Sequence, residues 1–217
     1  MQNDVPEAAP PGNLELVHAI FFDFDGVLTP DRTGTLTTCR YLAQATGIAL
    51  EDLLDAFEPH RAALARGRTT RDATWPLVCE ALGRDIPREL LVRAFESTPL
   101  DTAMFAFANS LGRHGRVGII TDNPKDRMDV VRSTLWLDRL FDPIVVSAEE
   151  GCAKDDPEIF RRALAQAGVP AARGVFIDNV EENVAVARTV GMHAIFFDDE
   201  KRDLAALARE LLALGIG

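Results

Sequence analysis

Apolar residues along the chain occur in two patterns, which are short continuous runs and longer repeats at helical spacing. Five continuous runs, rich in β-branched and aromatic residues, are expected to be strands: 17–22, 117–120, 143–146, 175–177 and 194–197. Continuous apolar runs are typical of parallel strands that are buried on both faces. Helical repeats follow the later strands, at 126–137, 157–167, 180–190 and 204–214. This alternation predicts an α/β fold with a doubly wound, five-stranded parallel sheet.

The segment 33–99 breaks the alternation, because its apolar residues recur only at helical spacing. It predicts four helices, which are separated by turn residues and cover 35–46, 51–65, 69–82 and 87–96. A further helix at 102–111 leads back to the sheet. We interpret 33–99 as a small all-helical cap inserted into a core formed by 14–32 and 100–217. The alternative is one larger α/β domain with a helical flank.

Composition narrows the classes of protein that the chain can represent. The chain has 217 residues, of which 47% are hydrophobic, enough for one full domain and a modest insert. Its formal net charge of −11 argues against a nucleic-acid or membrane partner. Three widely spaced cysteines favour a cytoplasmic protein over a disulfide framework or a zinc site. The Pro-rich segment 1–13 is expected to be a disordered leader rather than a signal peptide.

Polar side chains that could act in catalysis or ligand binding follow the first four predicted strands. They are Asp23 and Asp25 after the first strand, Thr121, Asp122 and Asn123 after the second, Lys154 after the third, and Asp178 and Asn179 after the fourth. In open α/β sheets, ligands bind at the carboxyl ends of the strands, so we expect these groups to converge. A carboxylate nucleophile with a hydroxyl, a lysine and further acids suits phosphoryl transfer through an aspartyl-phosphate.

Four segments resemble the signature motifs of the haloacid dehalogenase (HAD) superfamily in its phosphatase form. Residues 21–29 resemble the first motif, and Thr121 fits the second. Residues 154–160 resemble the third motif and residues 176–184 the fourth. The motifs occur in the order typical of that family, and the helical insert lies where the family has its cap. The resemblance therefore implies a Rossmann-like HAD core with a helical cap.

The same resemblance implies a Mg²⁺-dependent phosphatase with defined residue roles. Asp23 would attack the phosphorus, and Asp25 would protonate the leaving group and then deprotonate the hydrolytic water. Thr121 would donate to a phosphoryl oxygen, and Lys154 would neutralise developing negative charge. Mg²⁺ would bind Asp23, the main-chain oxygen of Asp25 and the fourth motif, because it favours oxygen ligands.

Two positions depart from the motifs of the family. Asn179 stands where a metal-binding Asp is usual, so we expect weaker Mg²⁺ binding unless Asp178 compensates as a ligand. Asp155 replaces a usual Pro and adds negative charge beside the catalytic lysine. Asp122 and Asn123, at the end of the second strand, are candidates for binding the substrate.

Several alternatives remain open at the level of sequence. The expected substrate is a small phosphorylated metabolite, because a cap excludes macromolecules from the site. A phosphomutase would need the same residues, and Asn179 would suit a binding protein with weakened catalysis. A dehalogenase is disfavoured, because carbon–halogen chemistry does not require Asp25. The sequence is compatible with a monomer or a homodimer, and the arginines of the insert (Arg61, Arg66, Arg68 and Arg71) are expected to be mostly solvated.

Overall fold

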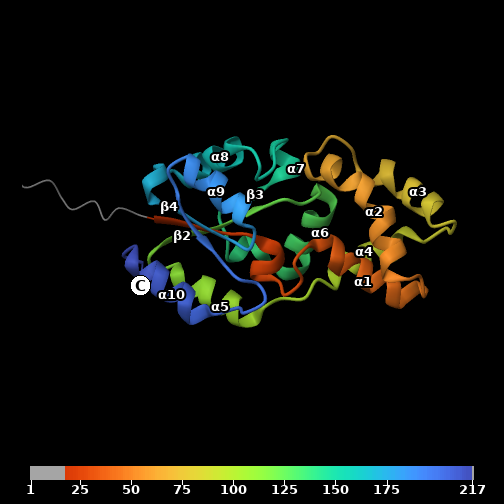
Figure 1. The fold of residues 1–217 in the computed structure, drawn as a ribbon, viewed down its shortest axis with the longest axis horizontal. Helices are drawn as coiled ribbons and strands as arrows, with labels where there is room; N and C mark the ends of the chain where they lie inside the picture. The colour runs from red at the N-terminus through yellow and green to blue at the C-terminus, as the bar shows by residue number, and fades with distance from the viewer. Residues whose placement is uncertain (1–17, 217) are drawn as a thin grey trace, which may run out of the picture.

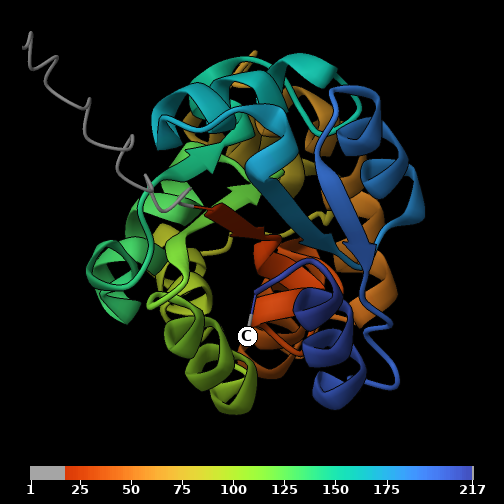
Figure 2. The same cartoon turned by 90° about the vertical axis from the view of Figure 1, so that its left-hand side faces the viewer.

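The computed structural model describes residues 18–216, and its centre is a five-stranded sheet in which all neighbouring strands are parallel. The strands are β1 (His18–Phe22), β2 (Gly115–Thr121), β3 (Ile144–Val146), β4 (Gly174–Asp178) and β5 (His193–Phe196). Their order is β3-β2-β1-β4-β5, so the chain winds outward from β1 in one direction and then in the other (Figure 2). The predicted α/β fold with a doubly wound sheet is thus confirmed.

Helices cover both faces of the sheet and bury two separate apolar clusters. They are α5 (Thr102–Leu111), α6 (Lys125–Leu135) and α10 (Leu204–Ala213) in one cluster, and α8 (Pro157–Ala167) and α9 (Glu181–Thr189) in the other. Alternate residues of β1 point into opposite clusters, with Ile20 and Phe22 in the first and Ala19 and Phe21 in the second. Burial on both faces explains why the strand has no polar residue between Ala19 and Phe22.

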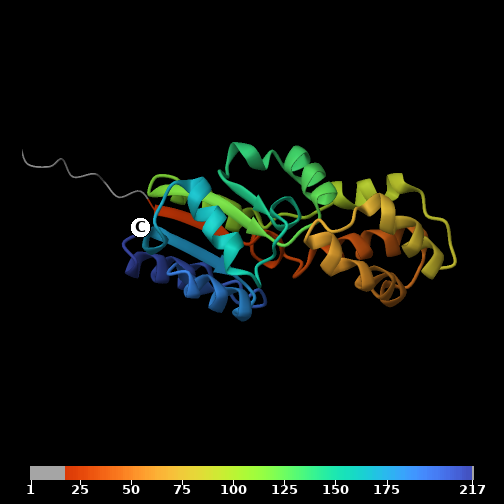
Figure 3. The ribbon, with the colours of Figure 1, turned by 90° about the horizontal axis from the view of Figure 1, so that it is seen from above.

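The helical insert lies at one end of the molecule, beyond the carboxyl ends of the strands (Figures 1 and 3). Its helices are α1 (Gly34–Thr46), α2 (Leu50–Ala65), α3 (Arg71–Ala81) and α4 (Arg88–Glu96). They enclose an apolar cluster of their own, in which the rings of Phe57 and Trp75 pack edge to face with centroids 6.0 Å apart. Val130 of α6 also packs against this cluster, so the helical insert and the core share an interface.

The structure differs from the sequence prediction mainly at helix ends and in short elements. Helix α6 ends at Leu135 rather than at 137, because Trp136 adopts a left-handed conformation with a φ of 56°. The helical turn η1 (Phe24–Leu28) and the short helix α7 (Ser147–Glu150) were not predicted. The leader predicted at 1–13 lies outside the described residues. No helix within 18–216 has the length and apolar character needed to span a bilayer.

Candidate active site

A tight turn follows β1 and carries the two carboxylates of the first motif. Asp23 precedes the turn η1 and Asp25 lies within it, where Gly26 reverses the chain with a φ of 86°. A Cβ atom on Gly26 would lie 2.2 Å from Nδ2 of Asn179, so only glycine fits there without displacement. Arg202 holds the turn by donating hydrogen bonds to the carbonyl oxygens of Gly26 and Val27, at 2.8 and 2.7 Å.

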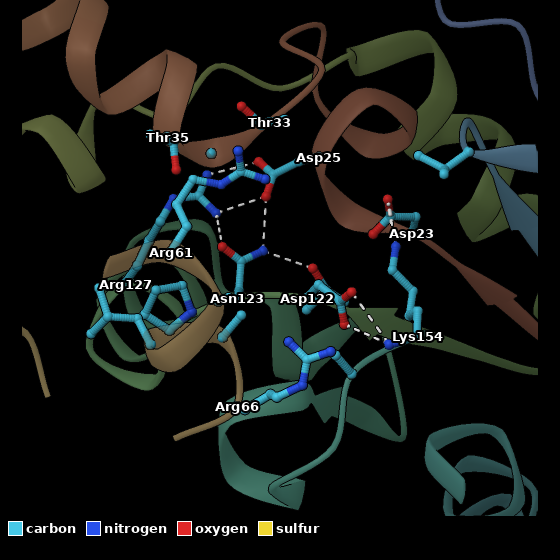
Figure 4. Close-up of a pocket in the computed structure, with 18 of the residues that line it drawn as sticks. Asp23, Asp25, Thr33, Thr35, Arg61, Arg66, Asp122, Asn123, Arg127 and Lys154 are labelled. Atoms are coloured by element: carbon cyan, nitrogen blue, oxygen red, sulfur yellow. Dashed lines mark hydrogen bonds and ion pairs between the residues drawn. The ribbon is translucent and has the colours of Figure 1, made fainter. Parts of the chain in front are cut away.

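The two carboxylates of this turn have different partners (Figure 4). One oxygen of Asp23 accepts a hydrogen bond from the amide of Phe24 at 2.7 Å, and the other lies 2.8 Å from Nζ of Lys154. The carboxylate of Asp25 instead faces Arg127 and Asn123. Both acids therefore reach the carboxyl edge of the sheet, as predicted, but each is held by its own set of donors.

Lys154 lies between two carboxylates and is only 3% exposed. Its Nζ is 2.8 Å from Asp23 and 2.7 Å from Asp178, and its amide donates to Asp122 at 3.0 Å. Burial by itself would lower the pKa of Lys154, but the surrounding carboxylates outweigh burial and raise it above its ordinary value. For Asp23, burial has the largest effect and raises the pKa of the carboxyl. Lys154 lowers this pKa, whereas the nearby carboxylates of Asp178 and Asp25 raise it, and the net shift is upward. Three carboxylates, those of Asp23, Asp122 and Asp178, thus lie around Lys154.

Thr121 ends β2 and presents its hydroxyl to the same edge, where it is 1% exposed. Asn123 donates its two amide hydrogens to Thr121 at 2.7 Å and to Asp25 at 2.8 Å. The side chain of Asn123 thus connects the hydroxyl predicted to bind phosphate to the predicted acid–base group. Asp122 and Asn123 both border the cavity, and their role in binding substrate stays a prediction.

The fourth motif contains Asp178, whose side chain accepts several hydrogen bonds, and Asn179, whose side chain has no hydrogen-bond partner in the described part of the chain. One oxygen of Asp178 accepts from Lys154 at 2.7 Å and from Asn183 at 3.1 Å, and the other accepts from the amide of Val180 at 2.7 Å. Asn179 is buried, and neither its amide oxygen nor its nitrogen has a hydrogen-bond partner within residues 18–216. A buried polar group of this kind needs an explanation, which a bound water or ion can supply.

Arg127, on the first turns of α6, is a site residue that the sequence interpretation missed. Its guanidinium forms a bidentate ion pair with Asp25 at 2.8 and 2.9 Å, and the arginine is 2% exposed. No local sequence signal marked it, because Asn123 precedes α6 and Asp25 lies 102 residues earlier in the chain. Arg202 was also missed, and it lies far from the motifs along the chain.

A cavity of about 410 Å³ connects this edge of the sheet to the helical insert. On the insert side it is lined by Arg61, Arg66 and Arg71, among other residues. Arg66 forms an ion pair across the cavity with Asp155 of the third motif. Arg71 is only 6% exposed and lies over the ring of Phe57, so it is an exception among arginines that were expected to be mostly solvated. Its guanidinium lies between that ring and Asp126 of α6, contacts that the sequence did not indicate.

Comparison with known proteins identifies the family. A family model described as haloacid dehalogenase-like hydrolase matches residues 17–191. The chain belongs to the haloacid dehalogenase-like hydrolases. The mycobacterial Phosphatase MT3486 is 30% identical over 217 residues, which cover 92% of this chain and 95% of that protein. Bifunctional epoxide hydrolase 2 of Rattus norvegicus is 28% identical over 88% of this chain, which spans 37% of the length of the rat protein.

Solved structures of HAD-like proteins share the fold of this HAD-like hydrolase. A predicted HAD-like family hydrolase from Porphyromonas gingivalis superposes with a TM-score of 0.73 at 22% identity, covering 90% of this chain and 98% of the other. A HAD family enzyme from Bacteroides thetaiotaomicron, in complex with magnesium and inorganic phosphate, gives a TM-score of 0.69 at 21% identity. That comparison covers 88% of this chain and 98% of the other. At these identities the likeness establishes the fold.

The arrangement in this HAD-like hydrolase has the parts that acyl-phosphate chemistry requires. A buried carboxylate at Asp23 is paired with a cation at Lys154, and a hydroxyl at Thr121 lies at the end of the neighbouring strand. A second carboxylate, Asp25, is fixed nearby by its own donors. A buried carboxylate, an ammonium group, a hydroxyl and a second carboxylate thus gather at one edge of the sheet.

Proposed function

We propose that this HAD-like hydrolase is a Mg²⁺-dependent phosphatase that cleaves a small phosphorylated metabolite through a phosphoaspartate at Asp23. The observation that carries the proposal is the buried contact of 2.8 Å between Asp23 and Lys154 beside Thr121. The similarity to a mycobacterial phosphatase over nearly the whole chain supports it. A glyceraldehyde 3-phosphate phosphatase of Pyrococcus abyssi, 33% identical over 84 residues, supports it as well.

The mechanism assigns one role to each of four side chains. An oxygen of Asp23 attacks the phosphorus, the bond to the leaving alcohol breaks, and the carboxyl of Asp25 gives its proton to that alcohol. Thr121 and Lys154 donate to the phosphoryl oxygens, which carry more charge in the transition state. Asp25 then takes a proton from water as this water attacks the phosphoaspartate. Inorganic phosphate leaves and Asp23 is regenerated.

The residues present fit Mg²⁺, although they do not form a cage of carboxylates. No group of three or more His, Cys, Asp or Glu residues suited to a metal occurs within 18–216. Asn179 offers an amide oxygen without a partner, and Mg²⁺ accepts such oxygens beside one or two carboxylates and retained waters. We therefore propose Asp23, the main-chain oxygen of Asp25 and Asn179 as ligands. Asp178, which was expected to compensate, accepts from Lys154, Asn183 and the amide of Val180, and we propose it instead as the partner of Lys154. Bound Mg²⁺ would offset the negative charge around Asp23.

The proposed function is tested by assaying phosphate release from p-nitrophenyl phosphate and from a panel of sugar, glycolate and nucleotide phosphates. We expect turnover that requires Mg²⁺ and stops when a chelator is added. Measuring free phosphate separates hydrolysis from mutase activity, in which the phosphoryl group stays on an organic acceptor. Halide release from 2-chloropropionate, or a lack of turnover with every ester at millimolar Mg²⁺, would contradict the proposal.

Replacing Asn179 with aspartate is expected to tighten the binding of Mg²⁺. The added carboxylate should lower the Mg²⁺ concentration for half-maximal activity by about tenfold, because ligand charge sets affinity at oxygen sites. Without Mg²⁺ the variant should unfold at a lower temperature than the wild type, since a further acid is buried beside Asp23 and Asp178. Titrating Mg²⁺ in the activity assay measures the first effect, and thermal unfolding with and without Mg²⁺ measures the second.

The matched control is the same substitution at Asn109, which is exposed on α5. Asn109→Asp should change neither the Mg²⁺ requirement nor the Mg²⁺-dependent shift in unfolding temperature. If Asn179→Asp leaves the Mg²⁺ dependence as it is in the wild type, then Asn179 is not a ligand.

A further inference from the structure

Arg127 and Asp25 form a buried ion pair in the site. The proposed mechanism does not explain why Asp25 has this partner. The side chains of Arg127 and Asp25 are 3% and 10% exposed. A buried ion pair is a weak source of stability, because the desolvation of both ions offsets their attraction. The pair therefore calls for a functional explanation as well as a structural one.

The hydrogen bonds of Asp25 leave one acceptor position open. Its Oδ2 accepts from Arg127 at 2.9 Å and from Asn123 at 2.8 Å, whereas its Oδ1 accepts from Arg127 alone, at 2.8 Å. A carboxylate offers about four lone-pair sites, two on each oxygen. Residues 18–216 use three of them, so in this part of the chain one site on Oδ1 remains for a proton or for a donor on the substrate.

The guanidinium of Arg127 is itself fixed from several sides. It donates to the side-chain oxygen of Asn123 at 2.6 Å and lies 5.7 Å from the ring centre of Phe24. Gly34, the first residue of α1, packs directly over it, and a Cβ atom there would lie 2.3 Å from the central carbon of the guanidinium. Arg127 thus contacts the first motif, the second strand end and the first helix of the insert at once (Figure 4).

We propose that Arg127 is a positioning residue, which orients Asp25 so that its one open site on Oδ1 carries the proton in phosphate-ester cleavage. This inference rests on the proposed phosphatase function. The bidentate contact prevents rotation of the carboxylate, and Asn123 ties its orientation to Thr121, the proposed donor to the phosphoryl group. Close packing at Gly34 makes that orientation depend on the position of α1. Such an orientation matters most where the leaving group needs a proton.

The test compares substrates that differ in their need for protonation of the leaving group. In Arg127→Gln, kcat/KM should fall about 100-fold for an alkyl phosphate, in the range of a lost general acid, but less than about threefold for p-nitrophenyl phosphate. Arg127→Lys, which keeps the charge without the two parallel bonds, should give an intermediate loss on the alkyl ester. In an Asp25→Asn background, Arg127→Gln should cause no further loss, because the group it orients is already absent.

Two further variants keep the test informative if Arg127→Gln folds poorly. Gly34→Ala should reproduce the selective loss on the alkyl phosphate, since the added methyl group displaces the guanidinium. Arg132→Gln removes another Arg–Asp pair of α6, the one with Asp138 at 2.6 Å, and should leave both substrates unaffected. Circular dichroism and thermal unfolding establish that each variant is folded.

The outcomes separate this inference from the proposed function. If the wild type hydrolyses neither substrate, the proposed function fails and Arg127 has no such role. If the wild type is active and the folded Arg127 variants lose activity equally on both substrates, the residue is merely structural and the inference is wrong. Faster cleavage of the alkyl phosphate by Arg127→Gln would also overturn it, because the arginine would then restrain Asp25.

Discussion

Replacing Asp23 with asparagine is expected to lower the rate of phosphate release by about 10⁴-fold or more, as is typical for loss of an enzyme nucleophile. The amide has nearly the shape of the carboxylate but cannot form the phosphoaspartate. Lys154 keeps its contact with Asp178 at 2.7 Å in this variant, so the fold of the site should persist. Steady-state phosphate release measures the loss, and mass spectrometry after rapid acid quenching should detect a phosphorylated wild type but no phosphorylated variant.

A control for this substitution is available on α6. Asp129 is exposed and forms an ion pair with Lys125 at 2.7 Å, so Asp129→Asn removes a carboxylate of the same kind away from the site. We expect this variant to keep wild-type activity. A phosphorylated protein or near-normal turnover in Asp23→Asn would show that another group attacks the phosphorus, and the proposed mechanism would have to be abandoned.

The strands and the site residues at the strand ends could be predicted from the sequence, because their signals are local. β1 is a continuous apolar run that ends directly before Asp23, and this pattern indicates a strand buried on both faces with polar groups at its carboxyl end. The parallel topology then brings the ends of β1, β2 and β4 to one edge. Thr121 and Lys154 lie at this edge, where the motif spacing placed them.

The contacts that complete the site could not be predicted, because they join residues that are distant along the chain. Arg202 binds carbonyl oxygens of the turn after β1, although it comes after the last strand. Arg127 meets Asp25 only because α6 begins beside the end of β2. That Asp178 binds the metal stays a prediction, and its sequence position did not indicate that Lys154, Asn183 and an amide donate to it. Residue type alone does not reveal whether the oxygens of a carboxylate are already engaged.

Replacing Lys154 with methionine is expected to remove activity and to destabilise the fold by about 3–5 kcal/mol at neutral pH, as is usual when one partner of a buried ion pair is deleted. The side chain of Asp178 is fully buried and that of Asp23 nearly so, so both would lose their cation without gaining water. Burial already raises the pKa of Asp23, and the loss of Lys154 would raise it further. The folded variant then binds a proton more readily than its unfolded chain does. Its stability should therefore rise relative to the wild type as the pH falls from 7 towards 5.

Urea unfolding at both pH values, in the absence of Mg²⁺, measures this difference in the free energy of unfolding. The control is Lys201→Met, since Lys201 is exposed and pairs with Asp198 at 2.6 Å on the surface. Exposed ion pairs contribute about 0–1 kcal/mol, so the control should unfold much like the wild type at either pH. A Lys154→Met protein as stable as the wild type at pH 7 would mean that Asp23 and Asp178 are not charged together in the folded state. The lysine would then be dispensable for the fold, and only the loss of turnover would remain to assign it a role.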